Sequence, residues 1–379
     1  MKEGDYKLDE RIFTENPEDD LWRELLQYSY KANVIRYLDE HSLPRDNNAI
    51  NCIIGSILQA HEYYLASKNV NLQIAPLLLY YGTTNLLFGI STLISGTAPT
   101  IQNHGMKPNS STIQNYIADS SVSFLDPDYG GIHQFAKAFG YNDDLTKLGT
   151  WKLKEFNSSI AEIHYDYKKC YSEKYGNTLM IDVFQTPTGQ IERLYCSKDE
   201  LLTIFDILNR VEGFNKSYLN PQTGHDCSNN TDYIILRHKM NDINIKKISF
   251  SGQPYLQAGI EKQGHIVTIP TLFNMYISLF IMSSLCRYHP ETWGPFVLND
   301  ETGERLLFEK LMYFSRRMIP NIILNKLYGK EITYVTQKYT EKETIKHVGE
   351  HEVKELIKQE LYAQEQQKNI LNRRGQIHQ

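Results

Sequence analysis

The chain has 379 residues, a hydrophobic content of 41% and a formal net charge of −5 at pH 7. The length allows two or three domains, and the composition is typical of a folded, soluble protein. A slightly acidic chain carries no global positive field that would draw it onto nucleic acid or anionic lipid. Either role would therefore need a local basic patch.

Cysteine spacing and the N-terminal segment bear on compartment and metal binding. The five cysteines are scattered and form no CxxC pair: Cys52, Cys170, Cys196, Cys227 and Cys286. Zinc sites and disulfide frameworks need tighter spacing, so we predict free thiols in a reducing cytoplasm. Residues 1–20 are polar and lack the apolar core of a signal peptide. The sequence predicts a cytoplasmic protein without a metal or cofactor.

The predicted first portion, residues 1–150, is helical. Apolar residues recur at helical spacing over 17–41 and 47–69, and a third helix is expected over 76–96. Short connections between consecutive helices favour an antiparallel bundle.

Residues 151–268 are predicted to form a mixed α+β insert. The stretch "VFQTPTGQIERLYC" has the pattern of a hairpin, and "YIILRHKM", "IKKISFSG" and "GHIVTIP" are predicted strands. A helix is expected over 197–214, with Ser197 and Glu200 in capping-box positions.

Residues 269–379 return to helical patterning. We expect an apolar helix over 269–286, a helix over 301–329 interrupted at Pro320, and a charged terminal helix within 340–379. The terminal helix would offer a docking face for a protein partner. The predicted fold class is mainly α, with helical-bundle portions flanking a small mixed sheet.

Two apolar runs, 75–96 and 269–286, raise the question of a membrane span. The first contains Asn85 and three glycines, and the second is near the lower length limit for a span. Both are predicted to be helices buried in a globular core, without a membrane.

Three short motifs could carry chemistry. In "NHGMK", His104 suits a general acid or base and Lys107 suits an anchor for phosphate or carboxylate. The alternative is a polar connection after a helix. In "CRYHPETWG", Arg287, His289 and Trp293 could hold a nucleotide or a carboxylate. The alternative is helix termination, with cations at the helix end and an indole packed over it.

The third motif, "RYLDEH", places Arg36 and His41 about a turn and a half apart on a helix. Pairs of this kind serve metal-independent RNA cleavage in some helical proteins, but the pattern is short and also occurs by chance.

A composite site of the first two motifs depends on helix direction. The loops 101–108 and 287–294 follow the helices 76–95 and 270–286. We expect the loops to converge if these helices run parallel, and to lie at opposite ends if they run antiparallel.

The run "APLLLYYGTTNLLFGISTLISG", with Tyr80 and Tyr81, followed by "HGMK" and then by "RYHPETWG", resembles the YaaC-like family of bacterial proteins. The resemblance covers roughly residues 22–329 and implies no particular reaction. The tyrosine-rich helix is also similar to helices of HEPN-type bundles, which include RNases and defence components. Here "RYLDEH" precedes that helix, whereas the HEPN motif follows it, and "RRMIPN" has Asn321 where a histidine is needed. The resemblance thus implies a non-catalytic member, or a member whose active residues lie outside these two motifs.

Three functions remain open from the sequence. The leading one is a binding or scaffold component with a protein partner, in defence or stress response. The alternatives are a HEPN-like RNA-binding protein or metal-independent RNase, and a nucleotide sensor or small-molecule enzyme. No P-loop, HExxH, GxSxG or kinase motif is present, which argues against the enzyme classes that use them. Oligomeric state stays open.

Overall fold

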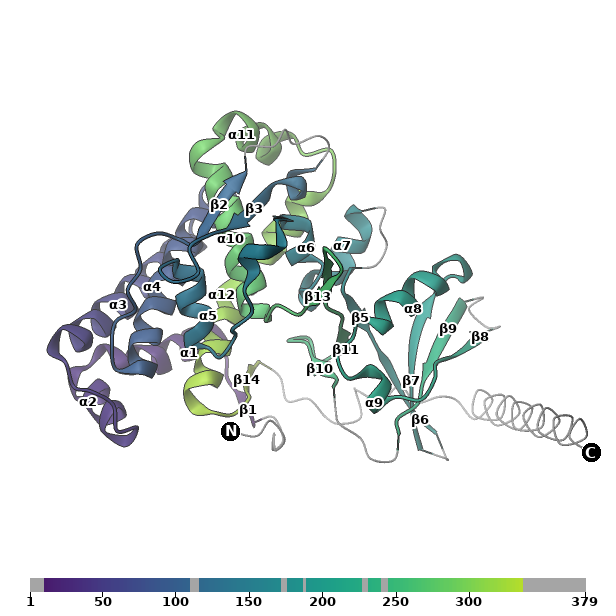
Figure 1. Cartoon of the computed structure of the whole chain (residues 1–379), viewed down its shortest axis with the longest axis horizontal. Coiled ribbons are helices and arrows are strands. Elements are labelled where there is room, and N and C mark those ends of the chain that lie inside the picture. Colours follow the sequence, from purple (N-terminus) through teal and green to yellow (C-terminus); the bar gives the residue numbers. More distant parts are fainter. Residues whose placement is uncertain are drawn as a thin grey trace, which may run out of the picture.

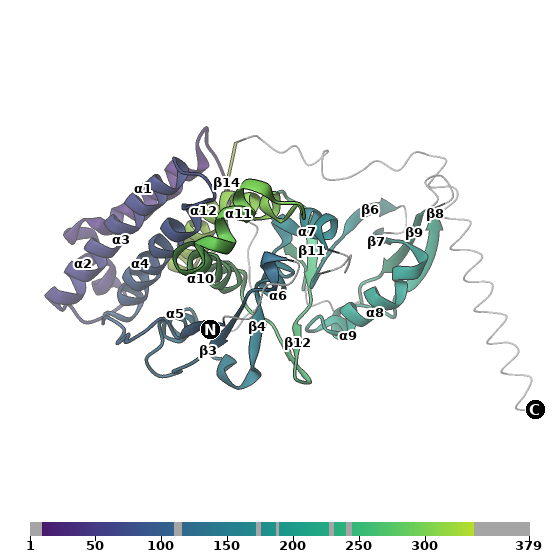
Figure 2. The ribbon, with the colours of Figure 1, turned by 90° about the horizontal axis from the view of Figure 1, so that it is seen from above.

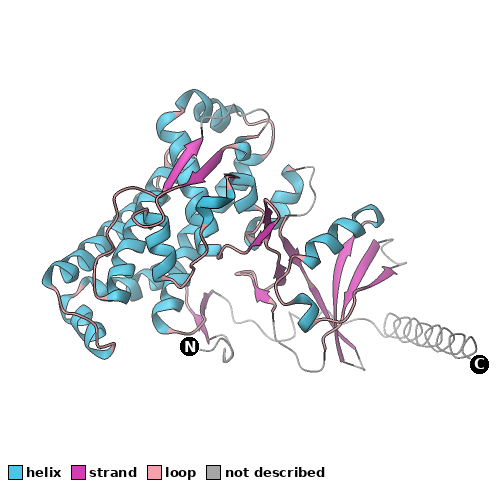
Figure 3. Ribbon diagram, in the orientation of Figure 1, coloured by secondary structure: helices cyan, strands magenta, loops and turns pink. Residues whose placement is uncertain are grey.

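The computed structural model describes residues 10–109, 116–171, 176–186, 189–226, 231–239 and 245–336. Helices gather at one end of the molecule and a small sheet with its own helices lies at the other (Figure 1, Figure 3). The predicted class, mainly α with small sheets, is confirmed. The α-helices are α1 Pro17–Leu26, α2 Lys31–Glu40, α3 Asn47–Lys68, α4 Ala75–Ser95, α5 Gly131–Ala138, α6 Leu153–Asn157, α7 His164–Cys170, α8 Leu201–Asn209, α9 Phe214–Ser217, α10 Thr271–Tyr288, α11 Pro290–Asn299 and α12 Glu304–Tyr328.

The strands form several small sheets rather than one large one. Their hydrogen-bonded orders are β1-β14, β2-β3-β4, β10-β11-β5, β12-β13 and β6-β7-β9-β8. The strands are β1 Glu10–Phe13, β2 Met106–Asn109, β3 Ser121–Phe124, β4 Thr150–Lys152, β5 Thr178–Met180, β6 Asp182–Thr186, β7 Gly189–Cys196, β8 Gln222–Asp226, β9 Thr231–Leu236, β10 Lys247–Ile248, β11 Pro254–Gln257, β12 Ile260–Lys262, β13 His265–Val267 and β14 Ile332–Val335.

The helical body is organised around α3, α4 and α10. The helices α3 and α4 pack along each other, and α10 lies against α4 (Figure 2). The Asp46 side chain caps α3 by accepting from the Ala49 backbone N–H at 2.8 Å. Gly96 ends α4 in the left-handed conformation, with φ 72°, which favours glycine.

Both apolar runs are buried helices, as predicted. By length and composition α4 could cross a membrane, but 61% of its most apolar window is buried inside the protein. Every residue of α10 from Leu272 to Leu285 is buried. A core helix passes the same length and composition test as a membrane span, and this burial favours a core helix.

Two predicted helix boundaries were wrong. The helix expected over 17–41 divides into α1 and α2, because Tyr30 is extended, with ψ 124°, and Ser29 Oγ bonds the carbonyl of Leu26 at 2.8 Å. The expected break at Pro320 does not occur, and α12 continues through it. Ile319 and Ile323 are fully buried on either side, so packing holds the helix together across the missing N–H.

A second, smaller core lies at the sheet end of the chain. Its buried residues come from Leu179–Ala258 and pack α8 against the β6-β7-β9-β8 sheet. The hairpin predicted in "VFQTPTGQIERLYC" is confirmed by the antiparallel pairing of β6 and β7. Trp151 and Phe156, which the sequence boundaries assign to the insert, pack in the larger core. The charged segment 340–379 lies outside the described residues.

Candidate functional site at the crossing of α4 and α10

The helices α4 and α10 run antiparallel. The Tyr80 ring stacks on Tyr276 with centroids 5.4 Å apart, and Cys286 Sγ donates to the carbonyl of Gln73 at 2.9 Å. The end of α10 therefore lies beside the beginning of α4.

The two candidate loops nevertheless approach each other. The chain turns at Gly96 and runs back along α4, so that His104 Nδ1 lies 2.8 Å from the Tyr80 hydroxyl. Arg287 Nη1 donates to the hydroxyl of Tyr81, the next residue on α4. The expectation that antiparallel helices would separate the loops was wrong. The connection after α4 runs back along that helix, and it brings His104 to the end of α4 where Arg287 also lies. We call Tyr80, Tyr81, His104 and Arg287 the α4/α10 site.

The loop "DPDYGG", residues 126–131, positions the backbone around His104. The Asn103 amide donates to Asp126 Oδ2 at 2.6 Å, and the carbonyl of Asn103 accepts from the Gly131 N–H at 2.9 Å. The carbonyl of His104 accepts from the Ile132 N–H at 3.1 Å.

Gly105 makes this close approach feasible. Its φ is 71°, and a Cβ there would lie 2.8 Å from Ile132 Cγ2 and 2.9 Å from Gly130 Cα. A side chain would therefore collide with the loop that holds His104.

His104 is a neutral imidazole at neutral pH. Burial lowers its pKa, and the Arg287 guanidinium lowers it further. The ring also packs against Phe280, with centroids 5.7 Å apart. Since Nδ1 is engaged by Tyr80, Nε2 is the nitrogen left for a ligand; it makes no hydrogen bond to any described residue.

Arg287 is a half-buried cation without a carboxylate partner among the described residues. Its guanidinium lies over the ring of Tyr81, 5.4 Å from the centroid, and over Tyr288 at 4.7 Å. Its Nε is buried and has no hydrogen-bond partner in the part of the chain that the structure describes. Natural proteins seldom leave a desolvated guanidinium unpaired, so an anion is the expected complement.

The remaining residues of the first two motifs are not brought into this cluster. Lys107 is exposed on β2, next to the buried Met106. His289 caps the end of α10 and pairs with Glu291 at 3.2 Å. Trp293 is fully buried and donates to the carbonyl of Gln73 at 3.3 Å, as expected for a residue that packs over a helix end.

The "RYLDEH" motif is also separate from this site. The ring of His41 stacks on Tyr37 with centroids 4.1 Å apart, and its Nδ1 lies 2.8 Å from the Tyr37 carbonyl. Arg36 donates to Asn33 Oδ1 at 2.8 Å. No hydrogen bond joins Arg36 and His41 in the described part of the chain.

Sequence reasoning missed the aromatic residues that surround the site. Tyr276 and Phe280 lie one helical turn apart on α10, and both contact Tyr80. Tyr63 of α3 stacks on Tyr81 at 6.1 Å. The spacing of four between Tyr276 and Phe280 was a visible signal, but it also describes any apolar helix face.

The smaller core holds a different cluster of charge. Glu192, which is fully buried, accepts from the Tyr218 hydroxyl and from His238 Nε2, each at 2.8 Å, and from the Lys246 ammonium. The carboxylate is thus surrounded by donors and paired with a cation, which is typical of a structural role. No group of His, Cys, Asp and Glu within the described ranges is arranged to hold a metal ion.

One comparison with known proteins gives a match. The model of the family described as YaaC-like Protein matches residues 17–327. The chain belongs to the YaaC-like family. The matched range includes every residue of the α4/α10 site. Comparison of this YaaC-like protein with curated proteins and with solved structures gave no match.

Proposed function

We propose that this YaaC-like protein binds a nucleoside phosphate, free or within RNA, at the α4/α10 site. The observation that carries the proposal is Arg287, a half-buried guanidinium with no carboxylate partner among the described residues. A phosphate oxygen would supply the missing charge and could also contact His104 Nε2.

The aromatic residues around Arg287 favour a nucleoside over inorganic phosphate. Tyr288 is 62% exposed beside the guanidinium, so its ring is open to a stacking partner. Stacking of a base on tyrosine contributes about 1–3 kcal/mol and tolerates any sequence.

The first test is native mass spectrometry of the purified protein with the absorbance ratio at 260 and 280 nm. Bound nucleotide or RNA supports the proposal. Thermal shift with mononucleotides, short RNA and inorganic phosphate then shows whether the ligand is a free nucleotide, RNA or phosphate alone. A ligand at a hundred times its Kd should add about 2.7 kcal/mol to the free energy of unfolding.

The matched variants are Arg287→Gln and Arg36→Gln. Both remove a guanidinium, but Arg36 is exposed on α2 and bonds only Asn33 among the described residues. Arg287→Gln should abolish the shift and Arg36→Gln should keep it. Equal shifts in both variants, or no shift with any phosphate, would contradict the proposal.

A metal-independent RNase is the second candidate, and the neutral imidazole of His104 favours it. Neutral histidine with an accessible nitrogen is the form that can exchange a proton with substrate. Cleavage of RNA in the presence of a chelator should then disappear in His104→Ala. Activity that survives in both His104→Ala and His41→Ala would exclude these histidines. The kinship to HEPN bundles, which suggested this activity, remains part of the same proposal.

The role with a protein partner, in defence or stress response, also remains a proposal. Its docking segment, 340–379, lies outside the described residues. Deletion of 340–379 should abolish partner capture and leave the unfolding temperature unchanged. A lower unfolding temperature would instead assign the segment to the fold.

A further inference from the structure

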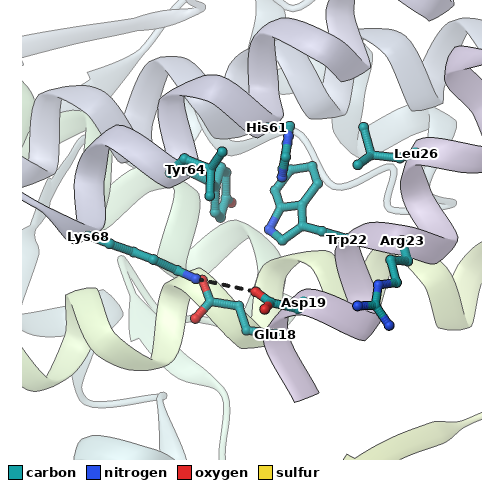
Figure 4. A pocket seen from close by; sticks show the side chains of 9 residues that line it. Glu18, Asp19, Trp22, Arg23, Leu26, His61, Tyr64 and Lys68 are labelled. Carbon is teal, nitrogen blue, oxygen red and sulfur yellow. Dashed lines mark ion pairs between the residues drawn. The ribbon is translucent and has the colours of Figure 1, made fainter. Parts of the chain in front are cut away.

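A pocket lies between α1 and α3, on residues that none of the sequence motifs singled out. Its volume is ≈ 210 Å³, below the range of about 300–1,000 Å³ typical of drug-sized ligands. Figure 4 shows the side chains around it. The lining residues are Glu18, Asp19, Trp22, Arg23, Leu26, His61, Tyr64, Leu65 and Lys68.

The indole of Trp22 presents an unsatisfied donor to this pocket. Trp22 is 3% exposed, and its Nε1 has no hydrogen-bond partner among the described residues. Figure 4 shows this nitrogen directed to the side where Tyr64, Lys68 and Asp19 lie. A buried N–H without an acceptor destabilises the folded protein, and an acceptor oxygen of a ligand would recover that loss.

The charged end of the pocket contains both signs. The Lys68 ammonium lies 3.2 Å from Glu18 Oε1 and 3.8 Å from Asp19 Oδ1. Burial lowers the pKa of the Arg316 and Arg317 guanidiniums of α12, and the nearby Glu18 carboxylate opposes that shift. Glu18 therefore lies close to several cations. The Lys68 ammonium has three N–H donors and faces two carboxylates, so one donor is left for a ligand oxygen.

One wall of the pocket is apolar and aromatic, and Arg23 beside it pairs with Asp20 at 3.0 Å. Leu26 and Leu65 form part of the wall, and the His61 ring packs on Trp22 with centroids 5.0 Å apart. Burial lowers the pKa of His61, so its ring is neutral at neutral pH. This wall suits an uncharged side chain.

We propose that this pocket binds a free α-amino acid with an apolar side chain. The carboxylate would accept from the Trp22 N–H and pair with Lys68. The ammonium would pair with Asp19, whose side chain is 50% exposed. The side chain would lie against Leu26, His61 and Leu65. A simple anion would bind Trp22 and Lys68 but would be repelled by the carboxylates of Glu18 and Asp19. A zwitterion carries an ammonium for these carboxylates as well as a carboxylate for Trp22 and Lys68.

The test titrates the full-length chain with L-leucine, leucinamide and N-acetylleucine by calorimetry. Leucine should bind, while the two derivatives, each lacking one charge, should bind at least about tenfold more weakly, since tenfold is 1.4 kcal/mol. Tryptophan fluorescence should respond as well, because Trp22 lines the pocket and the other two tryptophans, Trp151 and Trp293, are fully buried and absent from its lining.

Two variants and a control locate the binding. Trp22→Phe keeps an aromatic ring and removes the N–H together with the five-membered ring that carries it, and Lys68→Met keeps an apolar stem and removes the charge. Each should weaken leucine binding about tenfold. Lys216→Met changes an exposed lysine of α9 and should bind like the unchanged protein. The proposal is overturned if no apolar amino acid binds at millimolar concentration. Equal binding by leucinamide, or wild-type binding in both variants, overturns it too.

Discussion

Glu192 in the smaller core is fully buried and Arg287 at the end of α10 is half-buried, and the partners that surround these two charges differ. Glu192 accepts from Tyr218 and His238 and pairs with Lys246. Within the described residues, Arg287 bonds the hydroxyl of Tyr81 and keeps a buried Nε without a hydrogen-bond partner. A completed network stabilises the fold, whereas an incomplete one leaves energy available for a ligand. The difference separates a structural cluster from a candidate binding site.

The largest effect should come from the completed network. Glu192→Ala removes the buried carboxylate that pairs with Lys246, and removing one partner of a buried ion pair costs about 3–5 kcal/mol. Urea unfolding monitored by circular dichroism measures this. Glu212→Ala, an exposed glutamate of the same unit, should lose less than about 0.5 kcal/mol. Equal losses in the two variants would show that the buried Glu192 network stabilises the fold no more than a surface glutamate does.

The buried histidine His164 should make the unfolding free energy depend on pH. Burial lowers the pKa of His164 to about 4, and the unfolded value is near 6.5, so the shift corresponds to about 3 kcal/mol. The folded pKa is depressed, so this stability is present above pH 6.5 and is lost as the pH falls toward 4. His164→Asn should make the pH profile of the unfolding free energy shallower by that amount. An unchanged profile would show that the pKa of His164 is the same in the folded and the unfolded protein.

The next largest loss of stability should come from backbone strain at Gly105, in the loop that returns along α4. Gly105→Ala should destabilise the protein by about 1–3 kcal/mol, because the new Cβ meets Ile132 and Gly130 at a positive φ. Gly140→Ala is the matched control, since its φ is 87° and nothing lies within 4 Å of a Cβ there. Gly140→Ala should cost less and preserve nucleotide binding. Loss of binding in the control would show that the two glycines do not differ as the loop geometry requires.

Ligand binding at the α4/α10 site should depend on pH. The pKa of His104 is lowered in the free protein, and a bound phosphate favours the imidazolium, so binding takes up a proton. Affinity should therefore rise as the pH falls through the window below 6.5. His104→Gln should remove that part of the dependence and leave the titration of the phosphate itself. Calorimetry in buffers of different ionisation enthalpy measures the proton uptake directly.

The smallest effect on stability should come from Arg287→Gln. The guanidinium has no carboxylate partner among the described residues, so its loss should change the unfolding free energy by less than about 1 kcal/mol while ligand binding disappears. A loss above about 2 kcal/mol would assign Arg287 to the fold, as it is expected for Glu192.

Local pattern was sufficient for several elements. Apolar spacing and helix signals predicted α3, α4 and α10, and the turn chemistry around 186–189 predicted the β6–β7 hairpin. The two helix boundaries that were predicted wrongly depend on tertiary packing. Nothing in the sequence near Tyr30 marks a helix break, and Pro320 is tolerated only because α12 is buried on both sides of it.

The sequence by itself determined that His104 and Arg287 follow buried helices and that the chain carries the YaaC-like motifs. Only the tertiary structure decided that the connection after α4 returns to Tyr80, that Arg287 lacks a carboxylate partner in the described part of the chain, and that Trp22 lines a pocket. The physical reason is the distance along the chain between the residues that interact. Helix periodicity and capping involve neighbours within about four residues, whereas burial and pairing of charge depend on segments far apart in the chain.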